Sequence, residues 1–114
     1  MIDAQLADEL EAWIERGVVW DPVELDRFAA RLTDAGSPAG DLAHTFAALR
    51  LRLEMGAVDG WLQRDVEAVL YPRLWKIIEA VRDELPVREQ RTRIQVLNRR
   101  LARLFVTEDP PAPA

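Results

Sequence analysis

Apolar residues recur every three or four positions along almost the whole chain, and this spacing constrains the fold more than any other feature. In the first segment Ile2, Leu6 and Leu10 share one stripe, and charged residues occupy the opposite side. A period of about 3.6 residues is typical of amphipathic helices that pack one face on a core. No segment alternates with the period of two that half-buried strands show. The sequence therefore predicts an all-α protein.

Capping and helix-breaking residues divide this pattern into five predicted helices. Asp21 and Ser37 each precede a proline, which is typical of a helix start, and Asp59 is the expected cap of a later helix. Glycines such as Gly17 are placed to end the helices before them. The predicted helices cover residues 2–17, 21–36, 37–55, 61–84 and 87–105.

Two local features modify this prediction. Pro72 lies inside the fourth predicted helix, where proline removes a backbone hydrogen bond and clashes with the preceding turn. We therefore expect that helix to be kinked or split near Tyr71. Between the first two helices, the apolar residues Val18, Val19 and Trp20 are expected to turn toward the core.

The chain is long enough for one hydrophobic core. It has 114 residues, of which 49% are hydrophobic, and a chain of this size buries roughly two thirds of its extended surface on folding. It contains no cysteine, so packing rather than disulfides or thiolate-bound zinc must stabilise it. We expect a single-domain bundle of about five helices over residues 1–106. The proline-rich segment 107–114 is expected to be a disordered tail.

Several functional classes find no support in the sequence. The chain shows no signal peptide and no run of roughly 20 apolar residues, so we expect a cytoplasmic protein without a membrane partner. Glycine-rich phosphate loops, nucleophile elbows and zinc spacings are missing. His44 is the only histidine, too few for a carboxylate-bridged metal bundle, and a packed or interface imidazole is favoured over a haem ligand. We predict no catalytic residue, cofactor or metal site.

The third predicted helix has more apolar surface than one core contact requires. One stripe contains Leu42, Phe46, Leu49 and Leu53, and a second, on nearly the opposite side, contains His44, Ala48, Leu51 and Met55. Either this helix is central in its own bundle or a partner covers the second stripe. The four tryptophans favour an interface, because this residue is enriched at interface centres. The residues predicted to contact a protein partner or a second copy are Trp61, Trp75, His44, Leu51 and Met55.

The predicted helix 87–105 concentrates positive charge in a chain whose formal net charge is −5. It contains one acid, Glu89, and six arginines, which we predict to form an electrostatic docking face: Arg88, Arg91, Arg93, Arg99, Arg100 and Arg103. These arginines could pair with acids of the chain's own first helices, such as Glu11 and Glu24. They could instead dock on an acidic protein or a second copy, or bind nucleic-acid phosphates.

Nucleic acid is a less favoured partner than protein. A domain that binds nucleic acid is usually strongly basic, whereas this chain is acidic overall. A helix-turn-helix over residues 25–55 would place Asp41 at the leading end of its recognition helix, where it would repel phosphate. We therefore expect a non-catalytic protein-interaction module, such as an adaptor, a regulatory subunit or an assembly factor, working as a homodimer or in a larger complex. A nucleic-acid-associated regulator is the alternative, and a small helical enzyme or ligand carrier is the third.

Overall fold

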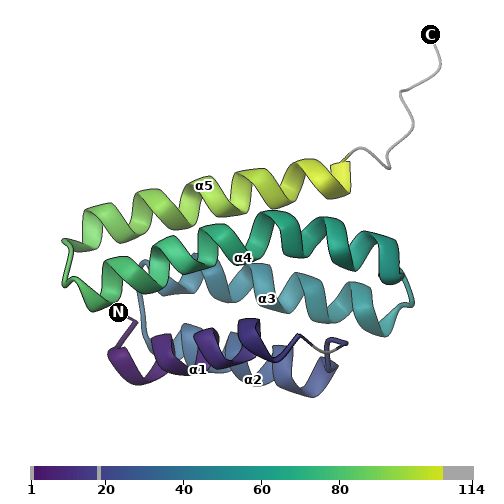
Figure 1. Cartoon of the computed structure of the whole chain (residues 1–114), viewed down its shortest axis with the longest axis horizontal. Helices are drawn as coiled ribbons and strands as arrows, with labels where there is room; N and C mark the ends of the chain where they lie inside the picture. The colour runs from purple at the N-terminus through teal and green to yellow at the C-terminus, as the bar shows by residue number, and fades with distance from the viewer. Residues whose placement is uncertain (1, 18, 107–114) are drawn as a thin grey trace, which may run out of the picture.

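The computed structural model describes residues 2–17 and 19–106, and these residues form five helices (Figure 1). The helices are α1 (Ala4–Arg16), α2 (Pro22–Asp34), α3 (Ala39–Glu54), α4 (Gly60–Arg82) and α5 (Val87–Val106). The described ranges contain no strand, so the all-α prediction is confirmed. None of the helices in these ranges combines the length and the apolar content that a membrane crossing requires. The tail predicted for 107–114 lies outside the described residues.

The helix ends follow the capping chemistry of the sequence at three predicted positions. The Asp21 carboxylate accepts a hydrogen bond from the Val23 amide at 3.0 Å and begins α2. The Asp59 carboxylate accepts one from the Leu62 amide at 2.8 Å and begins α4. Gly17 ends α1 with φ of 64°, a left-handed conformation that glycine adopts without the steric cost of a Cβ atom.

The start of α3 differs from the predicted Ser37 cap. Pro38 occupies the position before the helix, and no side chain caps the first amides. Because Pro38 already has right-handed helical dihedral angles, the side chain of Ser37 lies one position too far from the first amides of α3 to cap these amides. Its hydroxyl instead accepts a hydrogen bond from Arg91 Nη2 at 2.8 Å, which ties the start of α3 to α5.

α4 is one continuous helix through Pro72, so the structure does not show the two separate segments that a split would produce. Pro72 and Ala68 are both exposed. Water can therefore hydrate the Ala68 carbonyl, which loses its helical partner at the proline. This placement explains how the helix tolerates a proline in its interior.

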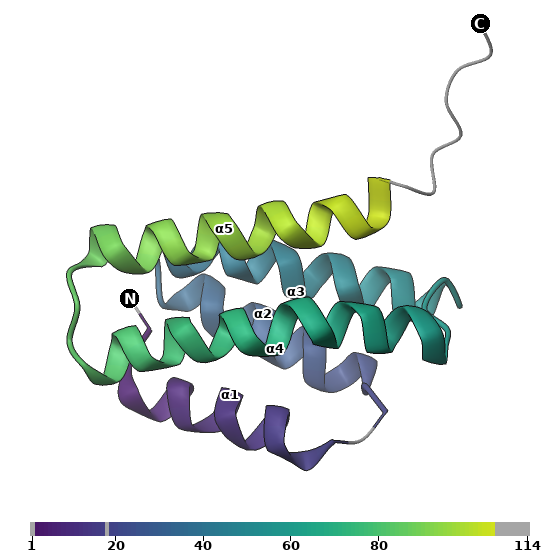
Figure 2. The same ribbon diagram turned by 45° about the horizontal axis from the view of Figure 1, so that its top comes forward.

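The helices surround one core in a spatial order that differs from their order in the chain (Figures 1 and 2). α4 packs on α1 and α5, while α3 packs on α2 and α5. α5 therefore lies at one edge of the bundle, and α1 and α2 lie at the opposite edge (Figure 1). This arrangement decides which charges can meet within the chain.

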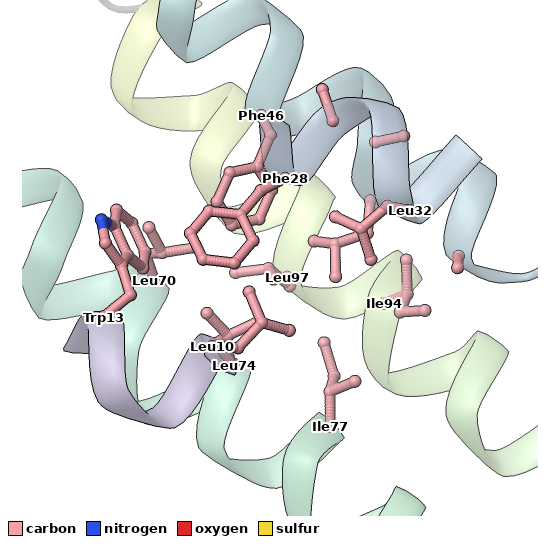
Figure 3. Close-up of a cluster of buried hydrophobic side chains, with 14 of the residues drawn as sticks. Leu10, Trp13, Phe28, Leu32, Phe46, Leu70, Leu74, Ile77, Ile94 and Leu97 are labelled. Atoms are coloured by element: carbon pink, nitrogen blue, oxygen red, sulfur yellow. The ribbon is translucent and has the colours of Figure 1, made fainter. Parts of the chain in front are cut away.

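All five helices contribute side chains to the core (Figure 3). Within this core the Trp13 ring contacts several other aromatic rings, and its centroid lies 5.5 Å from those of both Phe46 and Tyr71. Trp20 is 3% exposed, and its indole N–H donates to the Tyr71 hydroxyl at 3.0 Å. The predicted inward turn is therefore confirmed for Trp20 and wrong for Val19, which is 78% exposed; Val18 lies outside the described residues.

Candidate functional site

The second apolar stripe of α3 faces solvent. Leu42, Phe46 and Leu49 on the first stripe are fully buried, whereas Leu51 is 50% exposed and Met55 is 78% exposed. The other two members of the stripe, His44 and Ala48, are exposed as well. The interpretation of α3 as a central helix covered on both sides is therefore wrong. We call His44, Ala48, Leu51 and Met55 the α3 outer stripe.

A shallow groove of about 280 Å³ separates the α3 outer stripe from α5. We call it the α3/α5 groove, and its lining residues are Asp41, His44, Thr45, Ala48, Asn98, Leu101, Ala102 and Phe105. The Thr45 hydroxyl donates to Asn98 Oδ1, and Asn98 Nδ2 donates to the Asp41 carbonyl at 3.3 Å. These bonds hold the two helices together and leave a mainly apolar surface around Ala48 and Ala102.

The α5 side of this groove contains residues that the sequence did not single out as a contact surface. Phe105 is partly buried against the core, and the Arg52 guanidinium carbon lies 4.0 Å from its ring centroid. Ala102 falls among the arginines and is exposed. The available signal was an alanine within an otherwise charged face, since a small side chain leaves room between neighbouring helices.

The predicted Trp61 and Trp75 flank is not one exposed surface. Trp61 is 76% exposed near the start of α4, with the Arg64 guanidinium carbon 5.4 Å from its ring. Trp75 is partly buried against the core, and Arg82 lies 5.9 Å from its ring. Trp61 and Met55 stand on either side of the short turn between α3 and α4, at the same end of the bundle (Figure 1).

The arginines of α5 divide into engaged and free groups. Arg93 pairs with Glu89 at 3.2 Å and also donates to the Lys76 carbonyl, while Arg91 donates to Ser37. The side chains of the free group make no ion pair or hydrogen bond within residues 2–17 and 19–106, and all of its members are exposed: Arg88, Arg99, Arg100 and Arg103.

Other arginines neutralise the acids of α1 and α2. Arg82 of α4 donates to Asp8 at 2.8 Å and to Glu11, and these two carboxylates raise its pKa above the ordinary value, with Glu11 contributing most. Glu24 pairs with Arg16, and Glu9 pairs with Arg31. Pairing of the α5 arginines with these acids is therefore not what the structure shows. The physical reason is that α5 lies at the edge of the bundle opposite α1 and α2 (Figure 1).

A second hollow, of about 380 Å³, lies between α4 and α5. Its lining mixes both signs of charge, with Arg73 and Lys76 beside Glu79 and Glu89. The described residues contain no group of three or more histidine, cysteine or acidic side chains that could hold a metal ion. The α3/α5 groove has a more apolar lining than this second hollow.

Comparison with known proteins gives no relative of this chain: no family model, no curated protein and no solved structure matches it significantly.

Proposed function

We propose that the chain is a non-catalytic helical protein-interaction module, such as a small adaptor, a regulatory subunit or an assembly factor. The observation that carries the proposal is the exposure of Leu51 and Met55, which continue along α3 from the groove residues His44 and Ala48. Single exposed apolar residues are common, whereas contiguous ones are typical of binding surfaces. Fully burying an exposed leucine or methionine side chain contributes roughly 1.5–3 kcal/mol, and because Leu51 is 50% exposed it gains about half of that, so these two residues contribute to a moderate affinity.

The position of Trp61 also favours this end of the bundle as the contact region. It follows the α3–α4 turn closely and is largely exposed. Tryptophan is among the residues that most often dominate the binding energy of an interface. Trp75, in contrast, is proposed to stabilise the fold, because it packs against the core.

Affinity capture from the native cell tests this proposal when wild type is compared with a Leu51→Glu/Met55→Glu double variant. The matched control is Val19→Glu/Val23→Glu, because these valines are also 78% and 75% exposed but lie outside the groove region. We expect the protein partner to be captured by wild type and by the control and to be lost with the first variant. Equal capture by all three proteins would refute the proposal.

A nucleic-acid-associated regulator is the second candidate. Exposure of Arg88, Arg99, Arg100 and Arg103 without partners among the described residues favours it, since free arginines suit phosphate contacts. It ranks second because the net charge of −5 repels a polyanion at long range. An Arg99→Glu/Arg100→Glu variant tests it: unchanged nucleic-acid affinity and unchanged salt dependence would exclude the phosphate role.

A further inference from the structure

We infer that the α3/α5 groove receives an amphipathic helix of a partner protein, and that the flank of this helix facing α5 is acidic. The inference rests on the proposed interaction function and specifies the chemistry of the partner. Binding of an amphipathic helix in an apolar groove is a recurring mode of peptide recognition. Three properties of the groove support it: its direction and length, its apolar surface and the charge of one rim.

The groove has the shape that a short helix requires. α3 and α5 pack on each other, run in the same direction and form its two walls (Figures 1 and 2). The α3 outer stripe supplies His44 and Ala48 to one wall and continues beyond the groove to Met55, so the whole stripe rises by about 16 Å at 1.5 Å per residue. A partner helix of about three turns would match this length and present residues at positions i, i+3, i+4 and i+7.

The surface available to such a helix is mainly apolar. Ala48 and Ala102 have small side chains on opposite walls, and Leu101 and Phe105 contribute larger ones. Beyond the groove, Leu51 and Met55 extend the apolar surface along α3. The polar groups of Thr45 and Asn98 already bond to each other, so an apolar partner face would not leave them unsatisfied.

The rim along α5 carries positive charge. On α3 the outer stripe contains no acid or arginine, and the two charged groups of this helix at the groove, Asp41 and Arg52, have opposite signs. On α5, Arg99 precedes Ala102 by three residues and so lies on a neighbouring part of the same helix side. Arg91 is held near the start of α3 by Ser37, and Arg52 lies over Phe105. Asp41 is the one carboxylate that lines the groove in the described part of the chain, so acidic groups on the partner would find complementary charge along α5.

A helix of a different protein matches the groove better than α1, α3 or α5 of a second copy does. The acid-rich helix α1 has no large apolar residue that is highly exposed among the described residues, so it cannot fill the groove. α3 has the apolar stripe without acids on it, and α5 would bring further arginines toward the arginines of the first copy. The charge pattern therefore favours a different protein over self-association.

Fluorescence anisotropy with designed peptides tests the inference on the full chain. The probe is a labelled peptide of about five helical turns with leucines on one face and glutamates along one flank. Its control has lysine in place of each glutamate. We expect the lysine peptide to bind at least about tenfold more weakly than the glutamate peptide.

Two neighbouring arginines provide the matched pair of variants. Arg100 follows Arg93 by seven residues and so shares the side of α5 that meets Lys76 on α4, away from the groove. We expect Arg99→Glu to weaken binding of the glutamate peptide about tenfold and Arg100→Glu to weaken it less than about threefold. Ala102→Glu should weaken it at least about tenfold by occupying the groove with a like charge. Circular dichroism and melting temperature check that each variant is folded.

Three results would overturn the inference: equal losses for Arg99→Glu and Arg100→Glu, tighter binding of a short DNA duplex than of the glutamate peptide, or a wild-type dimer that Leu51→Glu dissociates. If affinity capture depends on Leu51 and Met55 while the glutamate peptide does not bind, the interaction function stands and the inference about an acidic helix fails.

Discussion

Replacement of Tyr71 by phenylalanine removes one buried hydrogen bond while keeping the aromatic packing. Trp20 is 3% exposed and donates its indole N–H to the Tyr71 hydroxyl at 3.0 Å. Phenylalanine preserves the ring contact with Trp13, whose centroid lies 5.5 Å away at an interplanar angle of 80°. The variant therefore isolates the hydrogen bond that joins the α1–α2 connection to α4.

The variant leaves the Trp20 indole N–H without its acceptor, and this determines the expected loss in the free energy of unfolding. A buried polar group without a partner costs about 1–3 kcal/mol, and the half-buried position of Tyr71 places this case in the lower part of the range, at about 1–2 kcal/mol. For a domain of this size that loss corresponds to a decrease in melting temperature of about 4–8 °C.

Urea unfolding followed by circular dichroism measures this free energy. Trp20→Phe and the double variant complete a thermodynamic cycle, in which we expect a coupling energy of about 1 kcal/mol. A Tyr71→Phe variant that loses less than about 0.5 kcal/mol, with additive costs in the double variant, would refute the proposed role of this bond.

Three further predictions concern stability. Burial raises the pKa of Tyr71 above its ordinary value of 10.0. The contribution of Tyr71 to the free energy of unfolding should therefore be fully present below that value and be lost as pH rises through the raised pKa of the folded state. Urea titrations at several pH values should show that the free energy of unfolding falls less steeply with pH for Tyr71→Phe than for wild type. Pro72→Ala should raise the unfolding free energy by about 1–3 kcal/mol, because it restores the hydrogen bond to the Ala68 carbonyl; unchanged thermal stability would show that Pro72 does not strain or bend α4. Glu84 follows the end of α4 and has a φ of 53°, a left-handed conformation that glycine adopts at lower cost. Glu84→Gly should therefore stabilise the chain by about 0.5–1 kcal/mol in urea unfolding, and a loss of stability would contradict this prediction.

The sequence predicts the helices well because their ends depend on local chemistry. Asp21 and Asp59 cap amides two or three residues away, and Gly17 supplies a left-handed residue at the end of α1. Such effects act within one turn and can be seen in a short stretch of sequence. Ser37 marks the limit of this reasoning, since its hydroxyl bonds to Arg91 rather than to the helix beside it.

The ion pairs and the groove depend on contacts between distant segments, and periodicity does not encode which helices become neighbours. Arg82 and Asp8 are far apart in the sequence but hydrogen-bonded in the fold, so an arginine of α4 rather than of α5 neutralises acids of α1. The exposure of the α3 outer stripe was one of two alternatives in the sequence, and only the spatial order of the helices decides between them. Ala102 became part of a candidate site for the same reason, because α3 lies beside it.

Site-specific photocrosslinking in the native cell tests the interaction function most directly. A photoreactive phenylalanine analogue replaces Leu51 on the α3 outer stripe, and in a second protein it replaces Val23, which is more exposed but lies on α2. We expect irradiation to join a discrete protein to position 51 and not to position 23. The absence of any adduct at position 51, or the same set of adducts at both positions, would contradict the assignment of the α3/α5 groove region as the partner-binding surface.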